Sequence, residues 1–79
     1  MLWAYVQKKP IRLTKHASDR AIKYDLDSEA IKRIIEEGRK QEEGKDKVKY
    51  VFRSKRGVLV AICSESPEQI VVITFTKGK

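Results

Sequence analysis

Residues 27–53 read DSEAIKRIIEEGRKQEEGKDKVKYVFR, and the period of the hydrophobic pattern changes within this stretch. Three isoleucines before Gly38 are spaced three and one apart, as on one face of a helix. After Gly38, Val48, Tyr50 and Phe52 fall on alternate positions, as on one face of a β-strand. The stretch therefore predicts a helix followed by a sheet, which is typical of an α+β domain.

Local signals define two helices. Asp27 has the side chain of a helix N-cap, and Gly38 is expected to end that helix in a left-handed conformation. Thr14 is a second candidate N-cap, and a helix of about ten residues is expected after it. That helix is marked by apolar residues spaced four, four and three apart: Leu13, Ala17, Ala21 and Tyr24.

Five segments have strand character. Residues 11–13 alternate as a half-buried strand does, and 70–75 are apolar on both parities, which indicates an interior strand covered on both faces. The remaining candidates are 39–43 (a polar edge strand), 48–53 and 58–63. The predicted fold is α+β, with two N-terminal helices packed on an antiparallel four-stranded sheet. Residues 1–79 form one domain, in which 1–10 are an N-terminal arm or an extra strand.

The composition excludes several classes of protein. The 79 residues are 41% hydrophobic and 37% charged, unlike a disordered chain. The single cysteine, Cys63, cannot form an intramolecular disulfide, and its apolar surroundings predict a buried, inert thiol. The apolar run 1–6 is too short for a signal peptide or a membrane span. We expect a cytoplasmic protein with no membrane contact, no metal site and no cofactor.

The charge is unevenly distributed along the chain. The net charge is +7, with +5 on residues 1–24, −3 on 25–46 and +5 on 47–79. Clustered cations release counterions when they meet phosphates, so two basic flanks favour a nucleic-acid partner. The alternative is a lysine-rich surface that only keeps the domain soluble.

His16 and Arg20 are the candidate catalytic pair. They lie four residues apart and hence on one side of the first predicted helix. An imidazole transfers protons near neutral pH and a guanidinium grips a phosphate, as phosphodiester cleavage requires. The alternative is a structural histidine that caps or packs.

Further cations are candidate contacts for a nucleic-acid backbone. Two helices cannot cover both faces of the sheet, so we expect Lys49, Val51 and Arg53 to line an uncovered face on which His16 also converges. The other predicted contacts are Lys15, Lys55 and Arg56. Tyr24 and Tyr50 are either base-stacking groups or core residues, and Trp3 and Tyr5 either meet a partner or fill the core.

The chain also resembles a known family. The residues that carry the resemblance are the run Leu13-Thr14-Lys15-His16-Ala17-Ser18-Asp19-Arg20, the helix end Glu36-Glu37-Gly38 and the final strand Val71-Val72-Ile73-Thr74. Over about 11–76 they resemble a family of small prokaryotic domains that have a His-Ala-x-x-Arg signature and are grouped with the RelE/ParE toxin superfamily. The resemblance implies a RelE-like fold.

The resemblance also implies candidate functions. RelE-like toxins cut messenger RNA at the ribosome and are silenced by a cognate antitoxin, whereas ParE-like relatives inhibit gyrase. The hypothesis from the sequence is a toxin-like, RNA-binding protein and candidate metal-independent endoribonuclease, with RNA and an antitoxin as partners. The alternative is a non-catalytic nucleic-acid-binding or protein-interaction domain. Monomer and homodimer both remain open.

Overall fold

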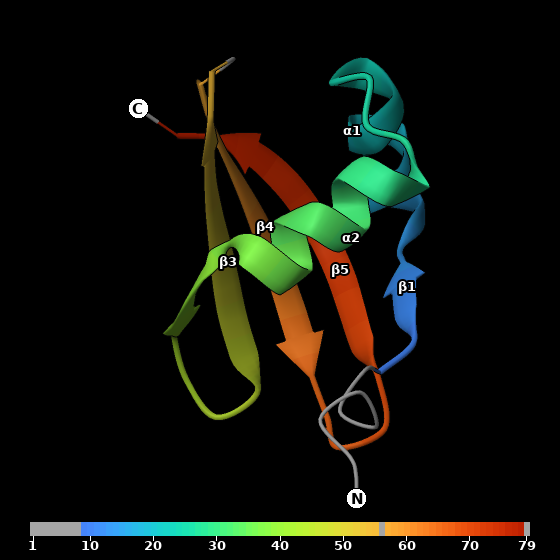
Figure 1. The fold of residues 1–79 in the computed structure, drawn as a ribbon. Helices are drawn as coiled ribbons and strands as arrows, with labels where there is room; N and C mark the ends of the chain where they lie inside the picture. The colour runs from blue at the N-terminus through green and yellow to red at the C-terminus, as the bar shows by residue number, and fades with distance from the viewer. Residues whose placement is uncertain (1–8, 56, 79) are drawn as a thin grey trace, which may run out of the picture.

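A computed structural model describes residues 9–55 and 57–78. The elements follow the order β1 (Ile11–Leu13), α1 (Lys15–Lys23), α2 (Ser28–Glu37), β2 (Arg39–Glu42), β3 (Lys47–Ser54), β4 (Gly57–Glu65) and β5 (Ile70–Lys77) (Figure 1). This is the predicted order of strand, helix, helix and four-stranded meander. The predictions for Trp3, Tyr5 and Arg56, and that of an arm or strand before Lys9, lie outside the described residues.

Both helices begin at the predicted caps. The Thr14 hydroxyl accepts a hydrogen bond from the Ala17 amide at 3.1 Å and donates one to the Ile73 carbonyl at 2.8 Å, so this cap also ties α1 to β5. The Asp27 carboxylate accepts from the Ala30 amide at 2.8 Å. Each cap satisfies a backbone donor that the first turn of a helix leaves without a partner.

Gly38 ends α2, but the predicted left-handed conformation is wrong. Its backbone is extended, with φ −70° and ψ 157°. A Cβ atom at this position would lie 2.3 Å from the Ile34 carbonyl oxygen and 3.2 Å from that of Val51. Glycine is therefore needed because the chain passes too close to α2 and β3 for a side chain.

The sheet has five strands in the order β1-β5-β4-β3-β2. The last four form the predicted antiparallel meander. The prediction of a purely antiparallel four-stranded sheet is corrected by β1, which pairs with β5 in parallel, with Ile11 opposite Ile70 and Leu13 opposite Val72. The sheet is therefore mixed, and the first strand joins the last one.

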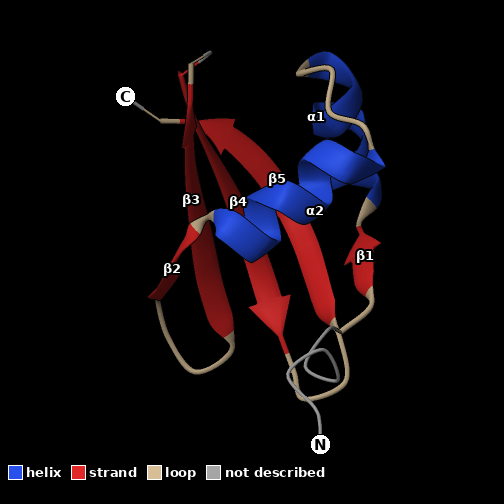
Figure 2. Ribbon diagram, viewed as in Figure 1, coloured by secondary structure: helices blue, strands red, loops and turns tan. Residues whose placement is uncertain are grey.

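Both helices lie on the same side of the sheet (Figure 2). Alternate strand residues point toward the helices and form one core with them. Its buried members are Ala17, Ala21, Ile31, Ile34, Ile35, Val48, Tyr50, Ala61, Cys63, Ile70, Val72 and Phe75. Strand β5 is interior, as predicted, but the helices cover only one of its faces. Apolar residues occupy both even and odd positions of β5 because a β-bulge leaves Ile73 without a partner in β4. The residues that face the helices therefore change from even to odd positions at the bulge.

Candidate functional site

The side of the sheet that faces away from the helices is called the open face here. Residues paired across neighbouring strands share a face, and the buried residues identify the helix side. The open-face residues are Arg12 of β1, Arg39 and Gln41 of β2, Lys47, Lys49, Val51 and Arg53 of β3, Val58, Val60, Ile62 and Ser64 of β4, and Val71, Thr74 and Thr76 of β5. In the described part of the chain, no helix lies on this side of the sheet (Figure 2).

The acidic side chains at the described strand positions are confined to the helix side of the sheet, which also holds Lys40 and Lys77. Among the described strand positions, the open face holds five cations and no carboxylate: Arg12, Arg39, Lys47, Lys49 and Arg53. The strand carboxylates Glu42 and Glu65 lie on the helix side, since they pair with the buried residues Val48 and Ile70. One acid approaches from a turn, where Glu43 Oε1 lies 3.4 Å from Lys49 Nζ. The open face is therefore strongly basic.

Most of these cations follow one strand. Lys47, Lys49 and Arg53 occupy alternate positions of β3, where neighbouring positions on one face are about 7 Å apart. Val51 fills the gap, and the neighbouring strand places Arg39 directly opposite it. Lys55 continues the line as an exposed residue of the next turn. A line of positive charge thus borders the valines and isoleucine of β4.

His16 and Arg20 lie elsewhere, on α1. His16 is exposed in the first turn, next to the exposed Lys15. Arg20 Nη1 lies 3.2 Å from the Tyr24 hydroxyl, and the Lys77 ammonium lies 5.4 Å from the centre of the Tyr24 ring. Lys77 is on the helix side, because it pairs with Leu59 opposite Phe52. His16, Arg20 and Tyr24 therefore form a row along α1 that ends at Lys77.

The structure does not bring the predicted site residues together. Helix α1 packs on β5 and β1, whereas Lys49 and Arg53 are on β3, two strands farther along the sheet and on its opposite face. The expected convergence of His16 with these cations is not found, because both helices cover the same side of the sheet. The candidate groups form two separate surfaces, the open face and the row on α1.

A polar cluster that the sequence did not predict surrounds Glu65. Its carboxylate accepts from Tyr50 Oη at 2.6 Å, from Lys9 Nζ at 2.7 Å and from Lys40 Nζ at 3.3 Å. Burial alone would raise the pKa of Glu65, but the hydrogen bonds from Lys9, Tyr50 and Lys40 outweigh it and lower that pKa to about 2. Tyr50 is a core residue, as one of the two interpretations held. Burial raises the pKa of Tyr50 above its ordinary value, and the hydrogen bond to Glu65 raises it further.

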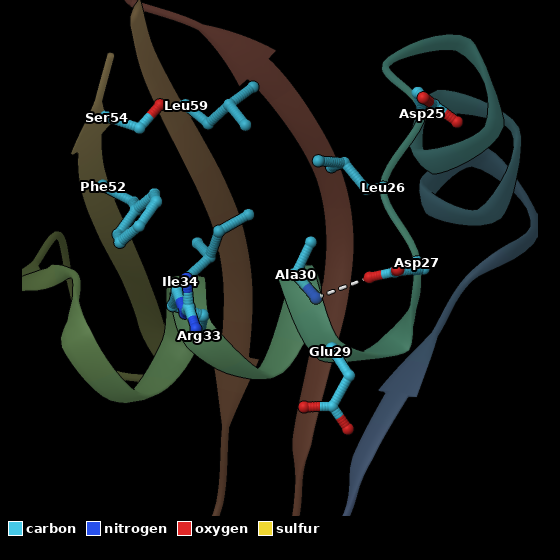
Figure 3. Close-up of a pocket in the computed structure, with 10 residues that line it drawn as sticks. All are labelled: Asp25, Leu26, Asp27, Glu29, Ala30, Arg33, Ile34, Phe52, Ser54 and Leu59. Atoms are coloured by element: carbon cyan, nitrogen blue, oxygen red, sulfur yellow. Dashed lines mark hydrogen bonds between the residues drawn. The ribbon is translucent and has the colours of Figure 1, made fainter. Parts of the chain in front are cut away.

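Cys63 and a cavity beside α2 are two further candidates for chemistry. Cys63 is fully buried, as predicted. Burial, together with the nearby Glu65 carboxylate, raises the pKa of Cys63 to about 12. The thiol is therefore protonated at neutral pH and is a poor nucleophile. A cavity of about 300 Å³ lies between α2 and the β3–β4 hairpin (Figure 3). Five of the ten residues that line it are apolar, the others are Asp25, Asp27, Glu29, Arg33 and Ser54, and Asp27 serves as the α2 cap.

Three comparisons with known proteins bear on this chain. No curated protein and no solved structure matches it. No helix in the described part of the chain is long and apolar enough to cross a membrane. One family model, described as a domain of unknown function (DUF4258), matches residues 13–76, from the end of β1 through most of β5. The relationship to the RelE/ParE superfamily remains a prediction. Because the match covers most of the chain, including both helices and the antiparallel meander, the chain belongs to the DUF4258 family.

Proposed function

We propose that this domain binds RNA through the open face. The observation that carries the proposal is the segregation of charge, since the five strand cations of that face have no carboxylate among them at the described strand positions. Phosphates neutralised by lysine and arginine release their counterions, and this gain is independent of the base sequence. The face has no described aromatic residue for base stacking, so contacts to the RNA backbone supply the affinity.

The non-catalytic form of the hypothesis has the better geometric support. Lys49 and Arg53 hold the RNA backbone in this proposal, and His16, the histidine of this chain, lies on α1 and not beside them on the open face. A RelE-like fold, a place in a toxin–antitoxin pair and an antitoxin that covers the open face belong to the same proposal. The order of the elements, with two helices ahead of an antiparallel meander, supports the RelE-like fold, and the toxin–antitoxin role rests on the sequence resemblance.

The salt dependence of RNA binding tests this proposal. Titration of a labelled single-stranded RNA 20-mer, followed by fluorescence anisotropy, should show that binding weakens roughly fiftyfold or more between 50 and 200 mM salt if four or five phosphates are contacted. Absence of binding at low salt would contradict the proposal. RNA binding that does not depend on salt would show that phosphate contacts do not supply the affinity, and absence of RNA binding would leave a protein target, such as the gyrase target of ParE-like proteins, as the alternative.

The row on α1 supports a second candidate, cleavage of a phosphodiester bond. Arg20 is held by its bond to Tyr24, and His16 lies one turn away on the same side of the helix. The imidazole would move the proton and the guanidinium would hold the phosphate. Such cleavage would use the α1 row alone, because the open-face cations cannot reach a phosphate bound there.

Replacing His16 by alanine distinguishes these two candidates. If the α1 row cuts RNA, His16→Ala should reduce cleavage at least about hundredfold while RNA binding and the melting temperature stay unchanged, because the side chain is exposed. Lys23→Ala, another exposed change on α1, is the matched control. Cleavage that is absent from the wild-type protein, or that is equal in both variants, would exclude the catalytic candidate.

A further inference from the structure

Strand β1 offers a free edge for another strand. It lies at one end of the sheet, and none of the described strands lies beyond it. Pro10 O accepts from the Ile70 amide at 3.0 Å and the Thr14 amide donates to Val72 O at 3.1 Å, so these two residues turn their backbone groups toward β5. Because successive residues of a strand alternate, the amides and carbonyls of Ile11 and Leu13 point away from the sheet.

An apolar cavity adjoins this edge on the helix side. Its volume is about 320 Å³, and it is lined by Ile11 and Leu13 of β1 and by Ser28, Ile31 and Lys32 of α2. Ile11 and Leu13 are only half-buried. A strand laid beside β1 would place alternate side chains in this cavity, where they would cover the exposed parts of both residues.

The charges around the edge specify the partner. Lys32 lines the cavity and Arg12 projects from the middle of β1 onto the open face, and both are exposed. No acidic side chain lines this cavity among the described residues. The opposite edge of the sheet differs, because all four residues of β2 are exposed and polar, with both signs of charge, a pattern that discourages strand addition.

We propose that β1 is a docking edge for an extended peptide segment that alternates apolar and acidic residues. The apolar side chains enter the cavity beside Ile11 and Leu13, and acidic side chains on the other face meet Arg12. The partner's backbone pairs with the amides and carbonyls of Ile11 and Leu13. Arg12 is the one cation that this edge shares with the proposed RNA site, whose other cations are on β2 and β3.

Hydrogen exchange of individual amides tests the docking edge. The probe is the peptide acetyl-Glu-Val-Glu-Val-Glu-amide, added to the full chain and followed by NMR. The amides of Ile11 and Leu13 should become protected by about tenfold or more, whereas the amide of Thr14, which is already bonded to β5, should change little. A peptide that is N-methylated at both valines should bind weakly, since it cannot complete the strand pairing.

A charge-reversal pair tests the specificity. Arg12→Glu should weaken peptide binding by about tenfold, because the acidic side chains of the peptide meet Arg12, and Lys45→Glu, an exposed change of the same charge in the β2–β3 turn, should leave it unchanged. No binding at millimolar peptide would overturn the proposal. So would protection of Ile11 and Leu13 before peptide is added, or a dimer whose formation blocks the peptide, since the edge would then have another occupant.

Discussion

RNA binding should fall by about a hundredfold when Lys49 and Arg53 are both changed to glutamate. Each change removes one cation from the β3 line and puts a carboxylate in its place, so two phosphate contacts become repulsive. Glu43 strengthens the effect, because it is 3.4 Å from the Lys49 ammonium and would face a second carboxylate in the variant. Anisotropy titration with a labelled single-stranded RNA at low salt measures the loss.

The matched control carries the same net charge at positions outside the strands of the open face. Lys32→Glu with Lys45→Glu alters α2 and the β2–β3 turn, both at exposed positions. We expect this control to bind RNA within about threefold of the wild type at moderate salt, because separated surface charges are screened within about 10 Å. Equal losses in the two double variants would mean that only the overall charge attracts RNA, and the open face would not be the site.

Replacing Glu65 by glutamine should destabilise the protein most at neutral pH. The folded-state pKa of Glu65 is about 2, below the ordinary value of 4.5, so its ionised form stabilises the fold. This contribution is complete above about pH 4.5 and is lost as the pH falls toward 2. A pKa difference of this size corresponds to roughly 3 kcal/mol in the free energy of unfolding. The glutamine variant should lack this pH dependence.

Urea denaturation at pH 7, 5, 3 and 2 measures the difference between the two proteins. The wild type should be the more stable by roughly 2–3 kcal/mol at pH 7, and the gap should close as the pH reaches 2. Glu68→Gln, an exposed change in the β4–β5 turn, should cost less than about 0.5 kcal/mol at every pH. A gap for Glu65→Gln that is the same at pH 7 and pH 2 would show that the ionised cluster does not stabilise the fold.

The parts of the fold that depend on residues close together in the sequence were predictable. Thr14 and Asp27 begin their helices as expected because a cap bonds an amide only three residues away. The sequence predicted that Gly38 ends the helix but not why a glycine is needed there. The reason is the close approach of Ile34 and Val51, not a turn conformation. The pairing of β1 with β5 joins residues from the two ends of the chain, and no local pattern encodes it.

The candidate site was predictable in its residue types but not in its arrangement. Alternation along β3 correctly placed Lys49 and Arg53 on the side away from the core. Alternation does not say which side of the sheet a neighbouring helix covers, so the separation of His16 from these cations required the structure. The cluster around Glu65 was missed because its partners Lys9, Lys40 and Tyr50 come from distant segments.

The parallel pairing of β1 with β5 has a consequence for how the domain folds. The Thr14 hydroxyl and the Ile73 carbonyl that it bonds are separated by 59 residues, so the chain must close a long loop before β1 and α1 can dock. The hairpins β3–β4 and β4–β5 join neighbouring segments and pay a much smaller entropic cost. We therefore expect the meander to form before the segment that holds His16 docks against it.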